Sequence, residues 1–307
     1  MPRLVPLPLA AHQPFRTAEH ANWGIGRGRL RSPDVAHPFH GINTAGGVPT
    51  SVRELAMACA PLLRDGDAFS HTTAALLFGA ELPEVHERES QVHITSIGGL
   101  DRFRRRGVRG HRATEVPPLV LVGVLPVVAP AYVWFQLASV LSVWDLVAVG
   151  DRWTTPRRRG STRRPPLVRP EELVHAVVAH AGQRGAVRAR EALRLVRAGA
   201  ESRMETHLRL LLAEAGLPEP LLNPGLRVRG ETLHPDLFFD RWRVVLEYEG
   251  DGHRTDPRQW RQDIWRREAF EEAGYRVVRV HRDDLLAEPQ AFLARVRRIL
   301  AQREGRA

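Results

Sequence analysis

From residue 201 to the C-terminus, apolar positions recur with helical and strand periods in turn. Their spacing predicts the order helix, three strands, helix, strand, helix. We therefore expect an α+β unit in which helices flank a mixed four-stranded sheet. The expected helices cover residues 201–215, 257–273 and 289–302, and the expected strands cover 226–230, 233–239, 243–249 and 275–281.

The preceding residues fall into three segments with different patterns. Residues 1–50 are rich in Pro, Gly and His, show no sustained period, and are expected to form a loosely ordered arm. Residues 51–165 predict a mixed α/β module that ends in an exposed basic loop, and residues 166–200 predict a helical connector. Within the module we expect helices at 51–64, 70–79 and 131–143 and strands at 91–96 and 119–128.

Residues 116–144 carry no charge and are long enough to span a bilayer. Pro126 and Pro130 divide this stretch into a strand-like and a helical piece, each of ordinary size for a protein core. We interpret it as a buried strand followed by a buried helix, outside any membrane. The N-terminal apolar run is broken by prolines and makes a poor signal peptide. A single cysteine, Cys59, excludes an internal disulfide, which fits a reducing cytoplasm.

A hairpin in the C-terminal segment is expected to bring carboxylates together. A tight turn centred on Arg241 and Trp242 pairs residues whose numbers sum to 483, which places Asp236 opposite Glu247. Glu249, two residues along, points to the same face of the sheet. Opposed carboxylates lie about 5 Å apart at Cβ and repel each other. Such a pair is tolerated when a divalent cation lies between the oxygens or when one acid is protonated.

A further carboxylate comes from the helix expected at residues 201–215. Glu205 lies in line with the apolar residues Leu208 and Leu212, so it can reach the sheet. A glycine-hinged turn after the acidic strand carries His253, an imidazole of the kind that transfers protons near neutral pH. This pattern predicts a metal-dependent phosphodiesterase. The candidate residues are Asp236, Glu247 and Glu205 for the metal, and Asp236, Glu247, Glu249 and His253 for catalysis.

The chain contains no lysine, so all 45 basic residues are arginine. Residues 201–307 contain 19 Arg and 19 Asp or Glu, so the whole net charge of +10 lies in residues 1–200. The basic part of the chain and the candidate catalytic segment are therefore different. Any chemistry that a lysine performs in comparable sites must come here from carboxylates, histidine and metal.

Five short motifs carry a resemblance to a known family. They are residues 201–205, His234-Pro235-Asp236, and residues 246–253, 262–267 and 274–280. On these motifs, residues 201–285 resemble the very-short-patch-repair-like endonuclease domain found in many bacterial proteins, a branch of the PD-(D/E)XK nuclease superfamily.

This resemblance implies a restriction-endonuclease-like fold and phosphodiester hydrolysis that depends on Mg²⁺ or Mn²⁺, with Asp236 and Glu247 as metal ligands. It also implies that Asp263 and Arg267, on the following helix, lie near the site. Arg254 or Arg267 would neutralise charge on the phosphate. Glu249 departs from the superfamily pattern, because it stands where the wider superfamily has lysine.

A basic segment in the first half of the chain is the candidate contact with nucleic acid. Residues 101–112 contain six arginines and one acid, and Phe103 between them could stack on a base. The second candidate is the arginine cluster at residues 157–164, whose alternative interpretation is a solvated linker. The arginines of the first segment are Arg102, Arg104, Arg105, Arg106, Arg109 and Arg112.

Two functions remain open at this point. The first is a DNA endonuclease, active in DNA repair or in defence against foreign DNA. The second is an inactive DNA-binding or antitoxin-like regulator that uses the nuclease fold as a scaffold. The second hypothesis draws on a weaker resemblance of residues 51–150 to abortive-infection type IV antitoxin-like modules, and it implies a toxin partner. Cutting both strands with one site per chain would need a homodimer or two successive nicks.

Overall fold

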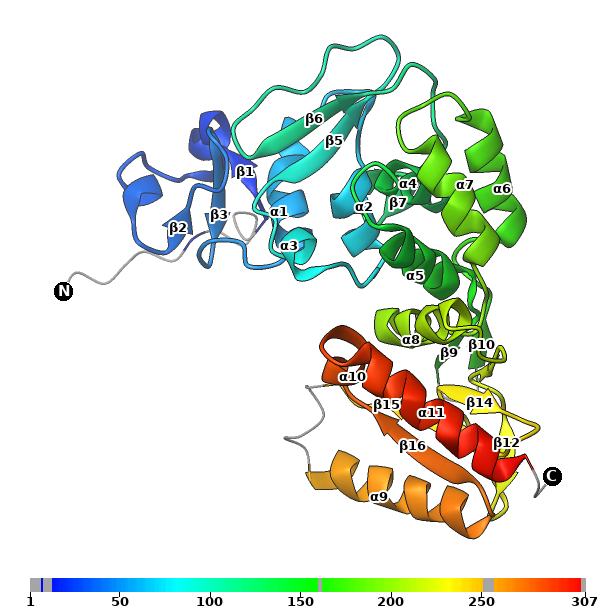
Figure 1. Ribbon diagram of the computed structural model, residues 1–307. Helices are drawn as coiled ribbons and strands as arrows, with labels where there is room; N and C mark the ends of the chain where they lie inside the picture. The colour runs from blue at the N-terminus through cyan, green and yellow to red at the C-terminus, as the bar shows by residue number, and fades with distance from the viewer. Residues whose placement is uncertain (1–6, 8–12, 160–161, 251–256, 305–307) are drawn as a thin grey trace. The chain divides into compact units, whose positions relative to one another are not determined.

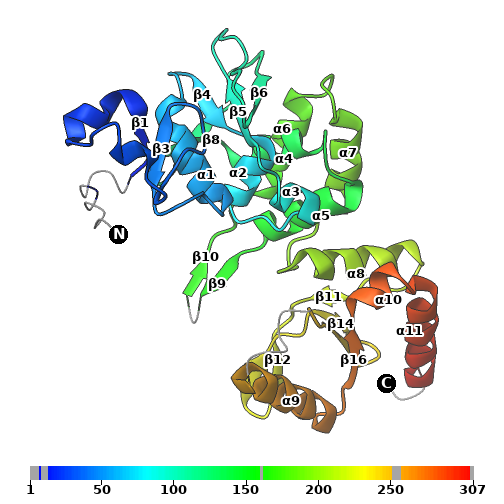
Figure 2. The ribbon, with the colours of Figure 1, turned by 90° about the vertical axis from the view of Figure 1, so that its left-hand side faces the viewer.

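The computed structural model describes residues 7, 13–159, 162–250 and 257–304 of the chain. Its helices and strands form two compact units, each coloured along the chain in Figure 1 and seen from a second side in Figure 2. The first unit comprises Met1–Val140 and His175–Ala186, and the second comprises Leu141–Val174 and Val187–Ala307. The boundary near residue 140 differs from the expected one near residue 165, and the expected connector 166–200 is shared between the units.

The first unit begins with a small sheet, where the sequence predicts a loosely ordered arm. Strands β1 (Phe15–Arg16), β2 (Val35–Ala36) and β3 (Ile42–Ala45) pair in the order β1-β3-β2, and two 3-10 helices, η2 (Thr17–Trp23) and η3 (Arg29–Arg31), lie between them. Phe15, Ile25 and Leu30 form its small core. These apolar residues are too widely spaced to produce a helical or strand period, so the sequence pattern does not reveal them.

A five-stranded mixed sheet forms the centre of the first unit, in the order β6-β5-β4-β8-β7. Strands β5 and β6 are parallel, as are β4 and β8, whereas β4 pairs with β5 and β7 with β8 antiparallel. The strands are β4 (Asp67–Phe69), β5 (Val92–Ser96), β6 (Val108–Arg112), β7 (Leu119–Val122) and β8 (Leu125–Val128). The helices are α1 (Val52–Cys59), η4 (Ala60–Leu62), α2 (His71–Leu77), α3 (Glu84–Glu87) and α4 (Pro130–Leu137).

The uncharged stretch forms a hairpin followed by a helix, so the expectation of one buried strand is wrong in part. Gly123, at φ +66°, turns the chain between β7 and β8. Strand β8 is largely buried, but β7 is the edge of the sheet, and its Leu121 is 72% exposed. Across the described residues, no helix combines the length and the apolar character that crossing a membrane requires.

The second unit opens with helices and a short basic hairpin. The segment that the sequence predicts to be a basic loop forms the two-stranded hairpin of β9 and β10. The elements are α5 (Val143–Thr154), β9 (Arg157–Arg159), β10 (Thr162–Arg164), α6 (Pro170–Ala179), α7 (Ala186–Leu195) and α8 (Arg203–Glu214). Helix α6 begins in the second unit and ends in the first.

A four-stranded mixed sheet with helices on both faces completes the second unit, which confirms the α+β class. Its order is β11-β14-β15-β16, with β15 and β16 parallel and the other pairs antiparallel. Figure 1 shows α9 and α11 on opposite sides of this sheet. The elements are β11 (Leu221–Leu222), β14 (Leu237–Phe239), β15 (Val244–Tyr248), α9 (Pro257–Glu272), β16 (Arg276–Val280), α10 (Arg282–Leu286) and α11 (Pro289–Arg303).

Two apolar clusters cover the faces of this sheet. On one face, Leu208 and Leu212 of α8 pack with Leu246 of β15 and residues of α11. On the other, Ala269 and Phe270 of α9 pack against Val245 and its neighbours. Because successive strand residues alternate between faces, Leu246 and Val245 belong to different clusters.

The membership of the sheet differs from the expectation. The strand predicted at 233–239 is split, because Pro235 lacks an N–H for the ladder, and its first part pairs with the preceding strand instead. Strands β12 (Leu226–Val228) and β13 (Glu231–Leu233) thus form a separate hairpin, turned at Arg229 and Gly230, both with positive φ. The fourth strand of the sheet is β11, which the pattern does not predict.

Candidate active site

The hairpin of β14 and β15 has the predicted register. Leu237 pairs with Leu246, Phe238 with Val245 and Phe239 with Val244, so all three pairs sum to 483. Asp236 directly precedes β14, and its Oδ2 accepts a hydrogen bond from the Tyr248 backbone N–H at 2.7 Å. The sequence pattern therefore placed Asp236 correctly beside the end of β15.

The predicted carboxylates line one cavity of about 1000 Å³ in the second unit. It contains all four predicted acids, which are Glu205 of α8, Asp236 directly before β14, Glu247 of β15 and Glu249 directly after β15. Asp263 and Arg267 of α9 also line it, as expected. Its charged and polar lining residues include Glu201, Glu205, Asn223, His234, Asp236, Glu247, Glu249, Asp263, Arg266, Arg267 and Arg279.

Glu205 is held at the first turn of α8. Ser202 caps this helix, and its Oγ accepts from the Glu205 backbone N–H at 3.2 Å. The Glu205 carboxylate oxygen Oε2 accepts from the Glu201 N–H at 2.8 Å and from Asn223 Nδ2 at 2.9 Å. Because Asn223 N–H also donates to the Asp236 carbonyl, the same loop orients both acids.

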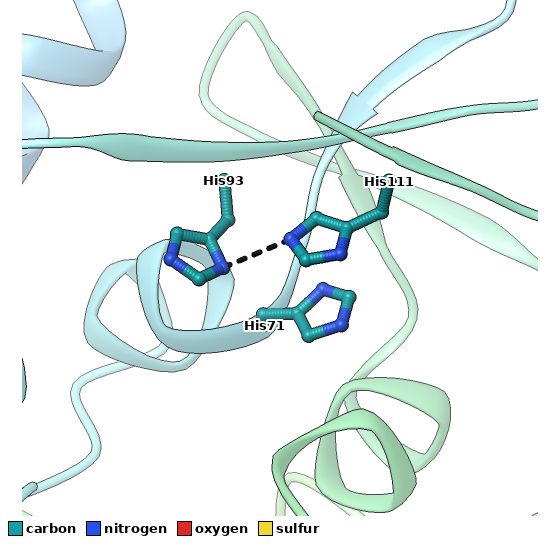
Figure 3. Close-up of side chains that lie close together, drawn as sticks. All are labelled: His71, His93 and His111. Atoms are coloured by element: carbon teal, nitrogen blue, oxygen red, sulfur yellow. Dashed lines mark hydrogen bonds between the residues drawn. The ribbon is translucent and has the colours of Figure 1, made fainter. Parts of the chain in front are cut away.

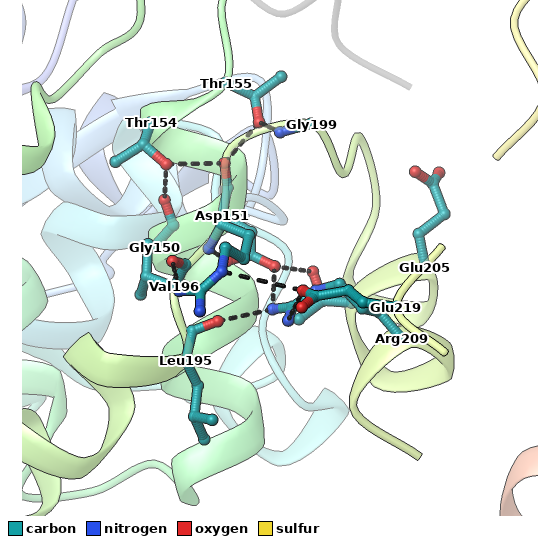
Figure 4. A network of polar contacts seen from close by, with 12 residues as sticks. Gly150, Asp151, Thr154, Thr155, Leu195, Val196, Gly199, Glu205, Arg209 and Glu219 are labelled. Atoms are coloured by element: carbon teal, nitrogen blue, oxygen red, sulfur yellow. Dashed lines mark hydrogen bonds and ion pairs between the residues drawn. The ribbon is translucent and has the colours of Figure 1, made fainter. Parts of the chain in front are cut away.

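A buried ion pair fixes α8 against α5 and thereby the position of Glu205 (Figure 4). Asp151 of α5 is fully buried, and its Oδ2 lies 2.9 Å from Arg209 Nη2 of α8. The same carboxylate accepts hydrogen bonds from Thr206 Oγ1 at 3.0 Å and from the Arg197 N–H at 2.7 Å. Burial raises the pKa of Asp151 to about 6, although Arg209 acts in the opposite direction.

Burial and mutual repulsion perturb the carboxylates of the cavity. Burial, together with the negative charge of Glu247, raises the pKa of Asp236 to about 7. Burial likewise raises the pKa of Glu205 to about 7, with a second contribution from Asp236. The pKa of Glu247 is also raised by burial, in spite of Arg266. Acids that repel one another in this way are typical of metal or catalytic sites.

These shifts predict how stability depends on pH. The native carboxyls keep their protons up to about pH 7, whereas the unfolded acids lose them near their usual values of 3.8 and 4.5. Native protein therefore binds more protons between those limits, and its free energy of unfolding falls as pH rises. In EDTA, we expect Asp236→Asn to unfold at a higher temperature than wild type at pH 8, with a smaller difference at pH 5.

Thermal melts at both pH values measure this effect. Asp240→Asn, an exposed acid on the same hairpin, is the control and should follow the wild type. Equal melting temperatures of Asp236→Asn and wild type at pH 8 would contradict the prediction that the buried, mutually repelling carboxylates destabilise the native protein.

Arg266 lines the cavity and contacts Glu247, although the sequence motifs did not single it out. Its Nη2 donates to Glu247 Oε1 at 3.0 Å and also to the His234 carbonyl, and its guanidinium lies 5.6 Å from the centre of the Phe270 ring. Helical spacing could have identified Arg266 from the sequence, because it precedes the buried Phe270 by four residues and therefore faces the sheet. Arg267, which the sequence predicts to neutralise charge on the phosphate, also lines the cavity, but its side chain pairs with Glu271 at 2.9 Å.

The other predicted residues have different outcomes. Glu249 lines the cavity, but its carboxylate forms an ion pair with Arg279 of β16. His281 Nδ1 lies 3.8 Å from the same carboxylate. His253 and Arg254 lie outside the described residues.

The arginines at 102–112 lie on the surface of the first unit, as the nucleic-acid hypothesis requires. Arg102, Arg109 and Arg112 line a cavity there, and Arg105 donates to the His40 carbonyl at 3.0 Å. Arg104 and Arg106 are exposed. The expectation for Phe103 is wrong. It is 7% exposed, and Arg64 covers its ring at 5.4 Å, so it cannot stack on a base.

A histidine cluster in the first unit was not anticipated. Among groups of three or more His, Cys, Asp or Glu in the described part of the chain, only His71, His93 and His111 have ligand atoms that all lie within 4.8 Å of one another. The carboxylates of the second unit are therefore spaced more widely than that. The available signal was the alternation of polar residues along β5 and β6, which puts histidines on the same face of neighbouring strands.

Comparison with known proteins gives relatives but no function. No protein-family model matches the chain. Two uncharacterised proteins of Mycobacterium tuberculosis are similar to it, MT2308 of strain CDC 1551 / Oshkosh and Rv2248 of strain ATCC 25618 / H37Rv. Each is 29% identical over 235 residues, covering 74% of this chain and 79% of the relative. The aligned stretch is longer than either compact unit, so these relatives share sequence with both.

Proposed function

We propose that this chain is a metal-dependent DNA endonuclease of the very-short-patch-repair-like type, with its active site in the carboxylate cavity of the second unit. The observation that carries the proposal is the convergence of Glu205, Asp236 and Glu247, which share one cavity and raise one another's pKa values. Such an arrangement destabilises the protein unless a cation offsets it, which favours a functional role. We place the activity in the cytoplasm, with DNA as the partner.

The oxygen chemistry of the donor set suits Mg²⁺ or Mn²⁺, and the side chains must move closer together to share one ion. Each of the three acids has a carboxylate oxygen held within the protein, toward Tyr248, Arg266 or Asn223. Hard oxygen donors of this kind are the ligands that Mg²⁺ prefers. Asp236, Glu247 and Glu205 would hold the ion, which when bound polarises the scissile phosphate and lowers the pKa of an attacking water.

The remaining residues orient the metal ligands and offset the charge of the phosphate. Arg266 holds the Glu247 carboxylate and, as a permanent cation, offsets negative charge beside the phosphate. It cannot accept the proton of the attacking water, because arginine does not lose its own at physiological pH. Glu249 is tied to Arg279 in this structure, so a water that transfers its proton to Glu249 requires that this ion pair open.

Plasmid nicking tests the proposal directly. The purified full chain is incubated with supercoiled plasmid in Mg²⁺, Mn²⁺ or EDTA, and nicked product is measured. We expect nicking with either metal and none in EDTA. DNA binding without cleavage at any metal concentration would contradict the endonuclease.

One observation favours the alternative function, a DNA-binding or antitoxin-like regulator. Glu249 stands where the wider superfamily has lysine, and the Arg279 ion pair occupies its carboxylate. If the fold is only a scaffold, the chain retains DNA affinity without cleavage and acts with a toxin partner. The nicking assay separates these outcomes.

Arg266→Met is expected to reduce metal-dependent nicking by about 10- to 100-fold, because residues that orient metal ligands contribute to this extent. As a positioning residue, it should change kcat more than KM for DNA, and Arg266→Lys should restore part of the rate. Arg267→Met is the matched control. Its side chain is 52% exposed and pairs with Glu271 on the same helix, so we expect a change below about twofold. An equal loss of nicking rate in both variants would show that Arg266 has no special role.

A further inference from the structure

Three imidazole rings converge within the first unit (Figure 3). His93 and His111 come from the adjacent parallel strands β5 and β6, and His71 is the first residue of α2. His111 pairs with Thr95, so His93, two residues before Thr95, points to the same face of the sheet. Segments far apart in the sequence thus contribute one ring each.

His71 adopts an unusual backbone conformation to join this cluster. Its φ is +50°, in the left-handed region that residues other than glycine rarely occupy. Its backbone N–H donates to Gln136 Oε1 at 3.1 Å, which holds it in place. Strained backbone of this kind concentrates at functional sites.

The nitrogen geometry fits a shared metal. His111 Nε2 lies 3.1 Å from His93 Nδ1. Two nitrogens that each lie about 2.0–2.1 Å from one zinc ion are about 3.3 Å apart in a tetrahedron and about 2.9 Å apart at right angles. The observed separation falls between these values. A direct hydrogen bond between the rings has a similar length, so the surrounding contacts must decide between the two.

The partners of the individual rings favour ligation. The His71 ring stacks on that of His111, with centroids 3.7 Å apart and planes 16° apart, so it must rotate to direct a nitrogen at the same ion. His93 Nε2 lies 3.0 Å from Glu89 Oε1, and Thr72 Oγ1 donates to the other Glu89 oxygen at 3.1 Å. A carboxylate in this position fixes the proton on Nε2 and leaves the Nδ1 lone pair directed at the cluster, as outer carboxylates do for metal-binding histidines. His71 Nδ1 lies 3.0 Å from Ser70 Oγ, which leaves its Nε2 for the cluster.

Burial keeps the rings neutral. It lowers the pKa of His71 well below its usual value, lowers that of His93, and lowers that of His111 to about 4, with Arg109 adding to the effect in each. Neutral imidazole is the form that binds metals.

The rings line a cavity of about 430 Å³ that favours anions. Its lining includes four arginines and a single acid, Glu115. Arg102 and Arg109 are close enough to His111 to lower its pKa. Arginine is the side chain that matches phosphate oxygens best. The arginines are Arg102, Arg109, Arg112 and Arg184.

We propose that His71, His93 and His111 bind one divalent first-row transition metal, with Zn²⁺ the best fit. Three imidazoles leave a fourth position of a tetrahedral ion open to the cavity, the pattern of zinc sites that act on a ligand. A phosphate group held by Arg102 and Arg109 takes that open position. This site is separate from the carboxylate cavity and uses nitrogen ligands.

Metal binding is measured on the full chain carrying Asp236→Asn and Glu247→Gln, which weakens the carboxylate cavity as a competing site. After removal of metal by chelation, Zn²⁺ is titrated by calorimetry, and Co²⁺ is titrated by its visible absorption. We expect one ion per chain, and at least about 100-fold weaker binding after His93→Gln or His111→Gln. Undetectable binding of both ions at micromolar concentrations would overturn the proposal.

Two further variants separate ligation from a structural role. Glu89→Gln should weaken Zn²⁺ binding by about 10- to 100-fold while circular dichroism stays unchanged. His175→Gln, an exposed histidine of the same unit, should bind as the parent does. Equal Zn²⁺ affinity in His111→Gln and His175→Gln would show that the histidines only hydrogen-bond to one another.

The phosphate ligand is tested on the Co²⁺-loaded chain. Inorganic phosphate and a 5′-phosphorylated oligonucleotide are added separately, and the visible spectrum is recorded. A spectral change with either one supports a phosphate ligand, and the more effective probe identifies a free or a nucleic-acid source. Arg102→Gln should keep Co²⁺ and lose at least about tenfold in phosphate affinity. An unchanged spectrum with both probes would overturn the phosphate assignment.

Discussion

Asp236→Asn is expected to reduce metal-dependent plasmid nicking by at least about 100-fold, because a bound metal contributes several kcal/mol of transition-state stabilisation and each 1.36 kcal/mol is tenfold in rate. The substitution keeps an oxygen for the Tyr248 N–H but removes the charge. It also relieves repulsion from Glu247, so the fold should be retained.

Rates are compared at saturating Mg²⁺ and again at raised Mn²⁺. Glu247→Gln should behave in the same way, whereas Asp240→Asn, an exposed acid at the hairpin turn, should nick at the wild-type rate. If Asp236→Asn cuts as fast as wild type, the carboxylate cavity is not the active site, and the resemblance to nucleases concerns the fold alone.

Arg209→Met is expected to lower the free energy of unfolding of the second unit by about 3–5 kcal/mol, because it leaves a buried carboxylate without its cation. Asp151 is fully buried, and Arg209 is 2% exposed. Arg209 Nη2 also donates to the Leu195 carbonyl at 2.8 Å, which the variant leaves without this donor. At about 2–4 °C per kcal/mol, the melting temperature should fall by about 6–20 °C.

The loss should be larger at pH 8 than at pH 5. Without Arg209, the already raised pKa of Asp151 rises further, so at pH 5 the carboxyl is protonated in the native state and its burial costs less. Arg197→Met is the control, because its side chain is 52% exposed and only its backbone N–H contacts Asp151. Denaturation of both variants at the two pH values checks the prediction, and equal losses in the two variants would refute it.

This ion pair also accounts for the boundary between the two units. A sequence pattern assigns α5 to the module that precedes it, since the apolar run continues from α4 into α5. In the structure, Asp151 binds residues of α8 and of the loop after α7. Helix α5 therefore belongs with the carboxylate cavity and helps to hold Glu205 in it.

The hairpin shows what local pattern can achieve. Strand periodicity and the turn at Arg241 and Trp242 predicted the register of β14 and β15, and the register brings Asp236 beside Glu247. The same reasoning merged β13 with β14, although Pro235 interrupts the ladder. The motif at residues 262–267 led to the prediction that Arg267 lies at the site. In the structure, Arg266 packs against Phe270 and contacts Glu247 instead.

The sequence by itself determined only those features that depend on interactions between residues close together in the chain. These features are the α+β class, the face of the sheet to which each strand residue points, and the side of the helix that carries Glu205. They follow from the repeats of the helix and the strand, which depend on residues only a few positions apart. The convergence of His71, His93 and His111, the small N-terminal sheet and the Asp151–Arg209 pair depend on how distant segments pack. Only the tertiary structure decides these, because side chains remote in the chain meet only when burial of the core brings their elements together.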